Sequence, residues 1–268
     1  MPELPEVETI VRELSSKIQG KKIVQIKILN PKLRQPIPQY ISNFTHKILS
    51  ITRQAKFIVM TLDTNNKIII HLGMTGKILI QKQQNSPLNK HDHFLIQLND
   101  NSSIIYNDTR KFGLVTTPEL APQSFFNSAP DPFEVSFSLE QFKQSLYNST
   151  RPIKTCLMNN NIITGVGNIY ANEALFKAKI LPTRAANTLR DSEIDLLIDK
   201  IKATLLDAIK AGGSSIKDYR NITDNPGYFQ QQLLVYNRTN QPCKLCTTPI
   251  KRSVISGRSA FFCYNCQK

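Results

Sequence analysis

Hydrophobic residues recur with helical spacing at the start of the chain. The positions of this stripe are Val7, Ile10, Val11, Leu14 and Ile18. Spacing of this kind buries one face of an amphipathic helix. It predicts a helix over residues 3–19, with Pro5 in the first turn, where its missing N–H costs nothing, and Gly20 as the stop signal.

From Ile23 to Thr117 the pattern changes to short runs rich in Ile and Val, with polar or glycine-containing breaks roughly every ten residues. The runs are Val24–Leu29, Lys47–Thr52, Phe57–Leu62, Lys67–Leu72, Lys77–Gln81, Phe94–Leu98, Ser103–Tyr106 and Leu114–Thr117. This spacing favours an antiparallel β-sandwich or a barrel.

Helical patterns return after a proline-rich stretch at 118–136, which is typical of a linker. The expected helices are Leu139–Tyr147, preceded by a capping box of Ser138 and Gln141, then Ile153–Asn160, Ile169–Lys179 and Asp191–Ala211. The tail from Asn225 is rich in turn formers and cysteine. We therefore expect an α+β chain divided at 1–130, 131–224 and 225–268.

The charge balance points to a polyanionic partner. Lys and Arg number 34 against 20 Asp and Glu, which gives a net charge of +14 and a pI near 9.6 over 268 residues. Such an excess favours nucleic acid, or less often an acidic membrane surface, although a generically basic protein remains an alternative. The chain lacks both an apolar run of roughly 18 residues and a signal-peptide pattern, so we expect an intracellular protein.

Four of the five cysteines lie near the end of the chain, as Cys243-x2-Cys246-x16-Cys263-x2-Cys266. Two CxxC pairs at this separation can place four thiolates around one Zn²⁺, with no ligand position left for water. The spacing predicts one structural zinc ion, and a pair of disulfides is the alternative that a reducing compartment disfavours. Cys156 is expected to be a buried small apolar residue.

The first residues carry possible chemistry. If Met1 is removed, Pro2 has a free secondary amine, whose pKa of about 7.7–8.0 leaves a usable neutral fraction at pH 7. Such an amine can attack a sugar C1′ and form an iminium. Glu3 and Glu6 share a helix face beside it. The alternative is that Pro and Glu simply suit the first turn of a helix.

Two glycine-containing segments are candidate phosphate contacts. The loop Lys251–Ser259 between the CxxC pairs is basic and rich in Ser and Gly, which suits phosphate contact or a solvated surface. Gly165–Asn168 precedes a predicted helix, whose first N–H groups can bind an anion. An ordinary turn between helices is the alternative for this second segment.

Two further turns each carry a large apolar residue. Met74 lies in the turn His71–Gly76, where a methionine is usually packed, and Asp108–Gly113 combines charge with an aromatic residue. If both turns face one cleft, Met74 and Phe112 could wedge into a base stack and Arg110 could fill a gap. The sequence does not show whether they converge.

Taken together, these motifs closely resemble the bacterial formamidopyrimidine-DNA glycosylases, over essentially the whole chain. The matching segments, in the family's order, are Pro2–Thr9, Arg53–Phe57, His71–Gly76, Lys90–His93, Asp108–Gly113, Gly165–Ala171, Pro226–Phe229 and the four cysteines with Gly257 and Arg258. The related endonuclease VIII group typically has Gly where this chain has Leu4.

The resemblance implies roles for individual residues. Pro2 matches the nucleophile, Glu3 the acid that opens the sugar ring, Glu6 a supporting carboxylate, and Lys56 and Arg258 catalytic cations. The positions that match DNA contacts are His71, Met74, His91, Arg110, Phe112, Arg151, Lys154, Asn168 and Tyr236. The four cysteines match the ligands of a zinc finger.

The resemblance also implies an N-terminal β-sandwich with a leading helix, a helix–two-turn–helix domain and a β-hairpin zinc finger. The expected activity is removal of oxidised purines from double-stranded DNA through a Pro2 Schiff base, followed by β,δ-elimination. A monomer in the bacterial cytoplasm, associated with the nucleoid, is expected. The alternatives are an endonuclease VIII-like enzyme for oxidised pyrimidines and a non-catalytic zinc protein that binds damaged DNA.

Four positions depart from the family pattern. Asn159 stands where many relatives have Asp, and Ala129 replaces a usual Gly. Asn237 and Thr239 interrupt a usual Tyr-Gly-Arg-x-Gly run. None of the four removes a catalytic group, so they bear on loop geometry and lesion preference rather than on the reaction.

Overall fold

The computed structural model describes residues 2–82, 87–215 and 219–268. Two compact units divide the chain: residues 1–125 with 211–230, and residues 126–210 with 231–268. The expected boundaries near 130 and 224 stay predictions. Within the described residues, no helix combines the length and apolar character needed to cross a membrane.

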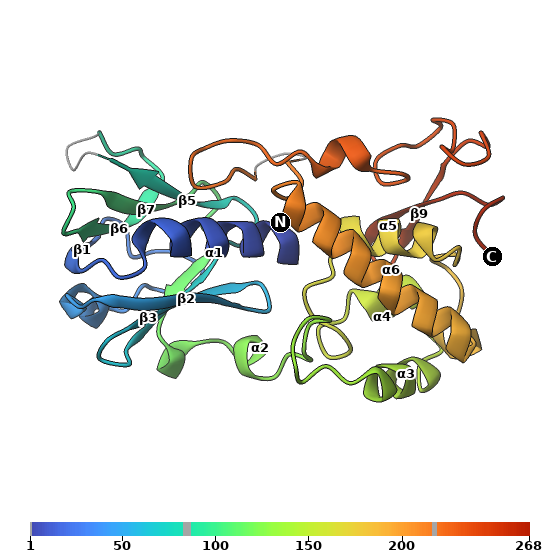
Figure 1. Cartoon of the computed structure of the whole chain (residues 1–268), viewed down its shortest axis with the longest axis horizontal. Coiled ribbons are helices and arrows are strands. Elements are labelled where there is room, and N and C mark those ends of the chain that lie inside the picture. The colour runs from blue at the N-terminus through green and yellow to red at the C-terminus, as the bar shows by residue number, and fades with distance from the viewer. Residues whose placement is uncertain (1, 83–86, 216–218) are drawn as a thin grey trace. The chain divides into compact units, whose positions relative to one another are not determined.

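The first unit begins with helix α1, Leu4–Ile18, as the apolar stripe predicts (Figure 1). Its stripe residues are buried and belong to one core cluster with residues of both β-sheets. The helix stops at Gln19, whose backbone is extended, and Gly20 then takes a φ of +85°. Glycine adopts this left-handed conformation readily, so the local sequence at Gly20 is sufficient to end the helix.

Two four-stranded antiparallel sheets follow α1 in this unit. One has the order β1-β6-β7-β5 and the other β2-β3-β4-β8. The strands are β1 Ile23–Ile28, β2 Ile48–Gln54, β3 Phe57–Leu62, β4 Lys67–His71, β5 Gly76–Gln81, β6 Asp92–Leu98, β7 Ser103–Asp108 and β8 Leu114–Thr116. All eight predicted runs are therefore strands, and the two separate sheets make a sandwich rather than a barrel.

Several short helical turns lie outside these sheets. They are the 3₁₀ turns η1 Gln39–Asn43, η2 Pro118–Leu120, η3 Ala186–Thr188 and η4 Phe229–Gln232, together with the short helix α2 Gln123–Phe126. The expected linker at 118–136 thus contains two such turns. Residues 211–230 return to the first unit, where Tyr219 and Ile222 join its core.

The second unit contains helices and one β-hairpin. Its elements are α3 Leu139–Tyr147, α4 Ile153–Leu157, α5 Asn168–Lys177, α6 Asp191–Lys210, β9 Lys251–Ile255 and β10 Arg258–Phe262. Ser138 caps α3 by accepting a hydrogen bond from Gln141 N–H, which is one of the two bonds of the predicted capping box. The expected helix to Asn160 ends earlier, because the Asn159 side chain accepts from Asn161 N–H and turns the chain.

Candidate active site and nucleic-acid interface

The head of α1 is a buried carboxylate cluster. Pro2 is buried, and Glu3 and Glu6 are only 4% and 2% exposed. Glu3 has an extended backbone as the N-cap, and its N–H donates to Glu6 Oε2 at 2.7 Å. A carboxylate that accepts from the N-cap N–H satisfies one donor that the helix cannot pair internally. The first turn therefore holds two acids beside Pro2.

A distant segment of the same unit completes this cluster. Glu6 Oε1 accepts a 2.8 Å hydrogen bond from Ser214 N–H. Gly213 has a φ of +82°, and a Cβ there would lie 3.1 Å from Glu6 Oε1 and 3.0 Å from the Tyr219 ring. Burial, followed by the charge of Glu6, raises the pKa of Tyr219, so its hydroxyl stays protonated. A side chain at position 213 would be strained by this φ and would require Glu6 or Tyr219 to move by a few tenths of an ångström.

Lys56 lies at the tip of the β2–β3 hairpin, which a largely buried ion pair ties to α1. Arg53 Nε lies 2.8 Å from Glu8 Oε2, and Arg53 Nη1 donates to the Ala55 carbonyl at 3.0 Å. Ala55 takes a φ of +55°, a conformation that a residue with a Cβ rarely adopts. The pair thus fixes the turn from which Lys56 projects.

His71, at the end of β4, lies directly opposite Phe57 in the sheet register. The two rings lie 4.8 Å apart, and His71 Nδ1 accepts from Gly73 N–H at 3.1 Å. Burial, then the nearby charges of Lys56 and Arg34, lower the pKa of His71 from 6.5 to about 4. His71 is therefore a neutral imidazole at pH 7, with two cations near it.

The turn that carries Met74 and the turn that carries Phe112 come together. A Cβ on Gly73 would lie 2.5 Å from the Phe112 carbonyl carbon, so the backbones are in direct contact. Met74 and Phe112 are 38% and 46% exposed, and the Arg110 guanidinium lies 4.6 Å from the centre of the Phe112 ring. The structure therefore brings together the two turns whose convergence the sequence left open, and each turn exposes a large apolar side chain.

The Asp108 carboxylate makes hydrogen bonds to both of these turns. It is fully buried, and its Oδ1 accepts from the Thr75 hydroxyl at 2.5 Å and from Arg110 N–H at 3.2 Å. Its Oδ2 accepts from Gly113 N–H at 2.8 Å. One carboxylate thus satisfies donors from both turns. No sequence pattern predicted this role for Asp108, although it begins the segment that carries Arg110.

In the second unit, Gly167 is the N-cap of α5 and Asn168 is its first residue. Asn168 Oδ1 is buried and has no hydrogen-bond partner among the described residues. Lys154, on α4, is fully buried, and its Nζ donates to the Ser259 carbonyl at 3.1 Å. Lys154 therefore packs against the hairpin, and its expected contact with DNA stays a prediction.

The hairpin tip presents Arg258. Ser256 and Gly257 form a two-residue turn with φ values of +47° and +72°, and Ile255 pairs with Arg258 across it. Positive φ at both positions matches the twist of a hairpin, which favours glycine at the second. Arg258 is exposed and lines a pocket together with Arg151, Lys154, Thr155, Met158, Asn159, Asn161, Ile255 and Ser256. Among the described residues, no acidic one lines this pocket.

Two buried residues of α5 hold the tail of the chain. Glu173 accepts from the N–H groups of Leu234, Val235 and Tyr236 at 2.8–3.0 Å. Asn172 Oδ1 accepts from Phe261 N–H at 2.7 Å. The sequence predicted neither contact, because a polar residue inside a helical pattern does not reveal a distant backbone partner. The Tyr236 ring packs against the Phe261 ring, with their centres 5.0 Å apart.

His91, another predicted DNA contact, lies in the first unit, where its backbone carbonyl accepts a hydrogen bond from Asp108 N–H.

The four tail cysteines form a cluster that could hold a metal ion. Their Sγ atoms all lie within 4.8 Å of one another, and Cys246 Sγ lies 3.4 Å from Cys263 Sγ. Tetrahedral zinc with Zn–S bonds of about 2.3 Å needs sulfur–sulfur separations of about 3.8 Å. The donor set and its dimensions therefore fit a structural metal site. Cys156 is buried and apart from the cluster, as predicted.

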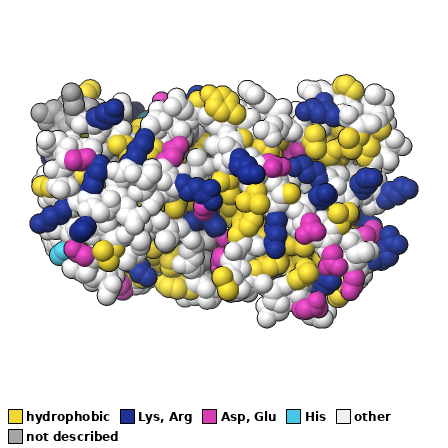
Figure 2. Space-filling model, in the orientation of Figure 1, with side chains coloured by type: hydrophobic (Ala, Val, Ile, Leu, Met, Phe, Trp, Pro, Cys, Tyr) yellow, Lys and Arg dark blue, Asp and Glu magenta, His cyan; other side chains and the backbone are white. Residues whose placement is uncertain are grey.

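Basic and acidic side chains are distributed differently over the visible surface. Figure 2 shows Lys and Arg spread widely over this face, while acidic side chains gather around α3 and the start of α6. The acidic residues there include Glu140, Asp191 and Asp195. Asp195 pairs with Lys143 at 2.7 Å. This acidic area is unsuited to a polyanion.

Comparisons with known proteins match the whole chain. The model of the formamidopyrimidine-DNA glycosylase N-terminal domain matches residues 1–115, and that of the formamidopyrimidine-DNA glycosylase H2TH domain matches 128–220. The formamidopyrimidine-DNA glycosylases of Rickettsia bellii and Histophilus somni are 42% and 43% identical over 273 and 272 residues, covering 100% of each chain.

Solved structures give the same result. Lactococcus lactis Fpg in complex with DNA containing an abasic site aligns over 100% of both chains, with a TM-score of 0.89 and 34% identity. The MutM (Fpg) protein of Thermus thermophilus aligns over 99% of this chain and 98% of its own, with a TM-score of 0.87 and 32% identity.

Proposed function

Because this chain belongs to the formamidopyrimidine-DNA glycosylase family, we propose that it excises oxidised purines, namely 8-oxoguanine and formamidopyrimidines, from double-stranded DNA. The observation that carries this proposal is the buried head of α1. Two carboxylates lie there beside Pro2, and one of them, Glu6, is held by hydrogen bonds from the neighbouring Glu3 N–H and from the distant Ser214 N–H.

The first chemical step uses the N-terminal amine. Removal of Met1, which lies outside the described residues, frees the Pro2 nitrogen. Its neutral form attacks C1′ of the damaged nucleotide, and the glycosidic bond breaks with its electron pair leaving on the base. Glu3 supplies the proton for opening of the sugar ring. The product is an iminium between Pro2 and the ring-opened sugar.

Strand cleavage follows from the same intermediate. The iminium acidifies the C2′ protons, so loss of one proton expels the 3′ phosphate, and a second elimination expels the 5′ phosphate. Lys56, on its fixed turn, and Arg258, at the hairpin tip, are the cations that assist these steps. Hydrolysis of the iminium returns the free amine and completes this lyase activity, which leaves a one-nucleotide gap.

Access to C1′ requires extrusion of the damaged base. Met74 and Phe112, each exposed on one of the two joined turns, would fill the stack and bend the duplex, with Arg110 in the gap. His71, His91, Arg151, Lys154, Asn168 and Tyr236 are the further positions that we assign to DNA binding. Lys154 acts there through the hairpin that it contacts.

The cysteine cluster holds one structural Zn²⁺ in this proposal. When bound, the ion fixes the two ends of the β9–β10 hairpin and takes no part in the reaction, since all four positions around it are thiolates. The protein acts as a monomer on chromosomal DNA in the bacterial cytoplasm.

Borohydride trapping tests the proposal. Wild-type protein with a processed N-terminus, mixed with an 8-oxoguanine duplex, should give a covalent adduct, and Pro2→Gly should give much less. Equal trapping by the two proteins, or no adduct with the wild type, would overturn the nucleophile assignment. Faster excision of thymine glycol than of 8-oxoguanine would indicate an endonuclease VIII-like specificity. Tight lesion binding without cleavage would indicate a non-catalytic protein.

A further inference from the structure

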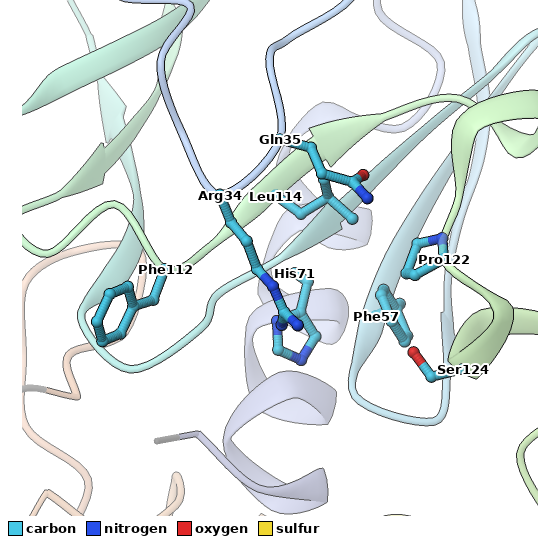
Figure 3. A pocket seen from close by; sticks show the side chains of 8 residues that line it. All are labelled: Arg34, Gln35, Phe57, His71, Phe112, Leu114, Pro122 and Ser124. Carbon is cyan, nitrogen blue, oxygen red and sulfur yellow. The ribbon is translucent and has the colours of Figure 1, made fainter.

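A pocket in the first unit combines donors from three separate segments. Figure 3 shows Arg34 and Gln35 on one loop, His71 at the end of β4, and Ser124 on α2. The other lining residues are Phe57, Phe112, Leu114 and Pro122, which form an apolar wall. None of the described residues that line the pocket is acidic, so its polar groups are suited to an anion.

Arg34 reaches into this pocket. The Arg34 loop is pinned at its base by the bridge between Lys32 and Pro36. In the view of Figure 3 the guanidinium overlaps the His71 ring in the pocket that both side chains line, and the charge of Arg34 acts on that ring. Within the part of the chain that the structure describes, no carboxylate pairs with Arg34. A guanidinium that shares a pocket with another donor and pairs with no acid has its fork of N–H groups available to a ligand.

His71 supplies a defined neutral donor at the same place. Its Nδ1 accepts from Gly73 N–H, so the single proton of the neutral ring must be on Nε2. The Phe57 ring packs against the imidazole at 4.8 Å and fixes its plane. Lys56 adds a second cation on the residue before Phe57. The tautomer is therefore determined by the backbone of the turn that also carries Met74.

We propose that Arg34 is a further DNA contact, whose guanidinium binds one backbone phosphate together with the Nε2–H of His71. The inference rests on the proposed function, because DNA supplies the phosphate. A phosphate diester has the charge and the two free oxygens that a guanidinium and a neutral N–H donor can share. The apolar wall beside it suits the sugar of the same nucleotide.

The salt dependence of binding measures the contact. The ligand is a duplex with a tetrahydrofuran abasic analogue, which cannot be cleaved by the glycosylase step. Each lost phosphate contact should reduce the slope of log K against log salt by about 0.9. Arg34→Ala should show this reduction, and Arg34→Lys should recover most of the slope. Lys17→Ala removes an equal charge from the exposed last turn of α1 and should leave the slope nearly unchanged.

Phosphate replacement locates the contact on the DNA. One methylphosphonate is moved along the duplex, so that each backbone position is neutral in turn. At one of the positions where wild type loses affinity, by about tenfold, Arg34→Ala should lose nothing further. His71→Gln, whose amide can replace the Nε2 donor, should retain the position dependence, whereas His71→Asn should lose it.

The outcomes separate the two proposals. If Arg34→Ala keeps the wild-type slope, or if every methylphosphonate penalty survives in it, the Arg34 contact is wrong although the enzyme still excises 8-oxoguanine. A pocket that took only free inorganic phosphate would show no position dependence and would overturn the inference in the same way. If wild type neither excises the base nor prefers the lesion duplex, the proposed function fails.

Discussion

Glu6 and Ser214 are 208 positions apart in the chain, and a 2.8 Å hydrogen bond joins the carboxylate of one to the backbone N–H of the other. The second oxygen of Glu6 accepts from Glu3 N–H. Both donors are fixed in the backbone, and the acid is buried. The position of the helix head therefore depends on a segment that follows the long helix α6, Asp191–Lys210.

Glu6→Gln should destabilise the first unit by about 1–3 kcal/mol, because one amide N–H₂ must then face a backbone N–H. The same change should slow adduct formation with 8-oxoguanine DNA, since Glu3 and Pro2 lose their support. Urea unfolding and single-turnover trapping measure the two effects. Glu140→Gln, on the exposed side of α3, is the charge control. A Glu6→Gln protein as stable as wild type would contradict this account.

Arg53→Lys should lower the rate of the chemical steps roughly tenfold, about 1.4 kcal/mol, with little change in KM. A lysine lacks the planar fork by which Arg53 reaches Glu8 through Nε and the Ala55 carbonyl through Nη1, so the Lys56 turn loses its fixed position. Arg12→Lys is a matched control, because Arg12 also pairs with Glu8 but is 63% exposed. Single-turnover cleavage with excess enzyme measures the rate. Equal rates for the two variants would show that the ion pair does not position Lys56.

Gly113→Ala should separate the Met74 and Phe112 turns. Its Cβ would lie 1.6 Å from Tyr106 Oη and 2.7 Å from the His71 carbonyl oxygen, so one of the two turns must move. We expect a loss of about 3 kcal/mol in the free energy of unfolding, together with loss of base extrusion. Fluorescence of 2-aminopurine next to the lesion reports extrusion.

Gly20→Ala is the control for backbone strain alone. Gly20 has a φ of +85°, and no described atom lies within 4 Å of the point that its Cβ would occupy. The substitution should therefore cost about 1–2 kcal/mol, with extrusion intact. If Gly113→Ala behaved like Gly20→Ala in both measurements, the close contact between the two turns would not matter for extrusion.

The stability of the first unit should fall as the pH drops from 6.5 to about 4 in part because of His71. Burial, with Lys56 and Arg34, lowers the pKa of His71 to about 4 in the folded state, against about 6.5 when unfolded. Between these pH values His71 is protonated in the unfolded chain but not in the folded chain. Its contribution to the free energy of unfolding is therefore present above pH 6.5 and is lost towards pH 4. It amounts to at most about 3 kcal/mol.

Urea unfolding of wild type and His71→Asn across this range measures the effect. The slope of the free energy of unfolding against pH should be smaller in the variant, by an amount that corresponds to at most one bound proton. Asparagine can still accept from Gly73 N–H, but it does not titrate. Identical slopes for the two proteins would mean that His71 titrates normally in the folded state.

Cys243→Ser, or removal of the metal with a chelator, should weaken DNA binding about tenfold or more by loosening the hairpin that presents Arg258. The second unit should stay folded, because Asn172 and Glu173 still bind the backbone at Phe261 and at 234–236. Metal content, circular dichroism and DNA affinity are measured together, with Cys156→Ser as the control. Unchanged affinity after complete loss of metal would refute the link between the metal and Arg258.

Local patterns in the sequence determined the elements of this protein. The stripe from Val7 to Ile18 is sufficient for α1, and the alternation of short apolar runs with breaks is sufficient for all eight strands of the sandwich. The CxxC spacing likewise anticipates the cluster of four thiols. These features depend on periods of a few residues, which burial on one face imposes whatever the rest of the chain does.

The tertiary structure alone decided which of these elements meet. The contact of the Met74 turn with the Phe112 turn, the bond from Ser214 to Glu6 and the burial of Lys154 under Ser259 depend on strand register and on the path of long connections. A buried carboxylate such as Asp108 or Glu173 finds its donors in backbone N–H groups, which every residue except proline possesses. No side-chain pattern marks such a partner, so these relationships become visible only once the chain is folded.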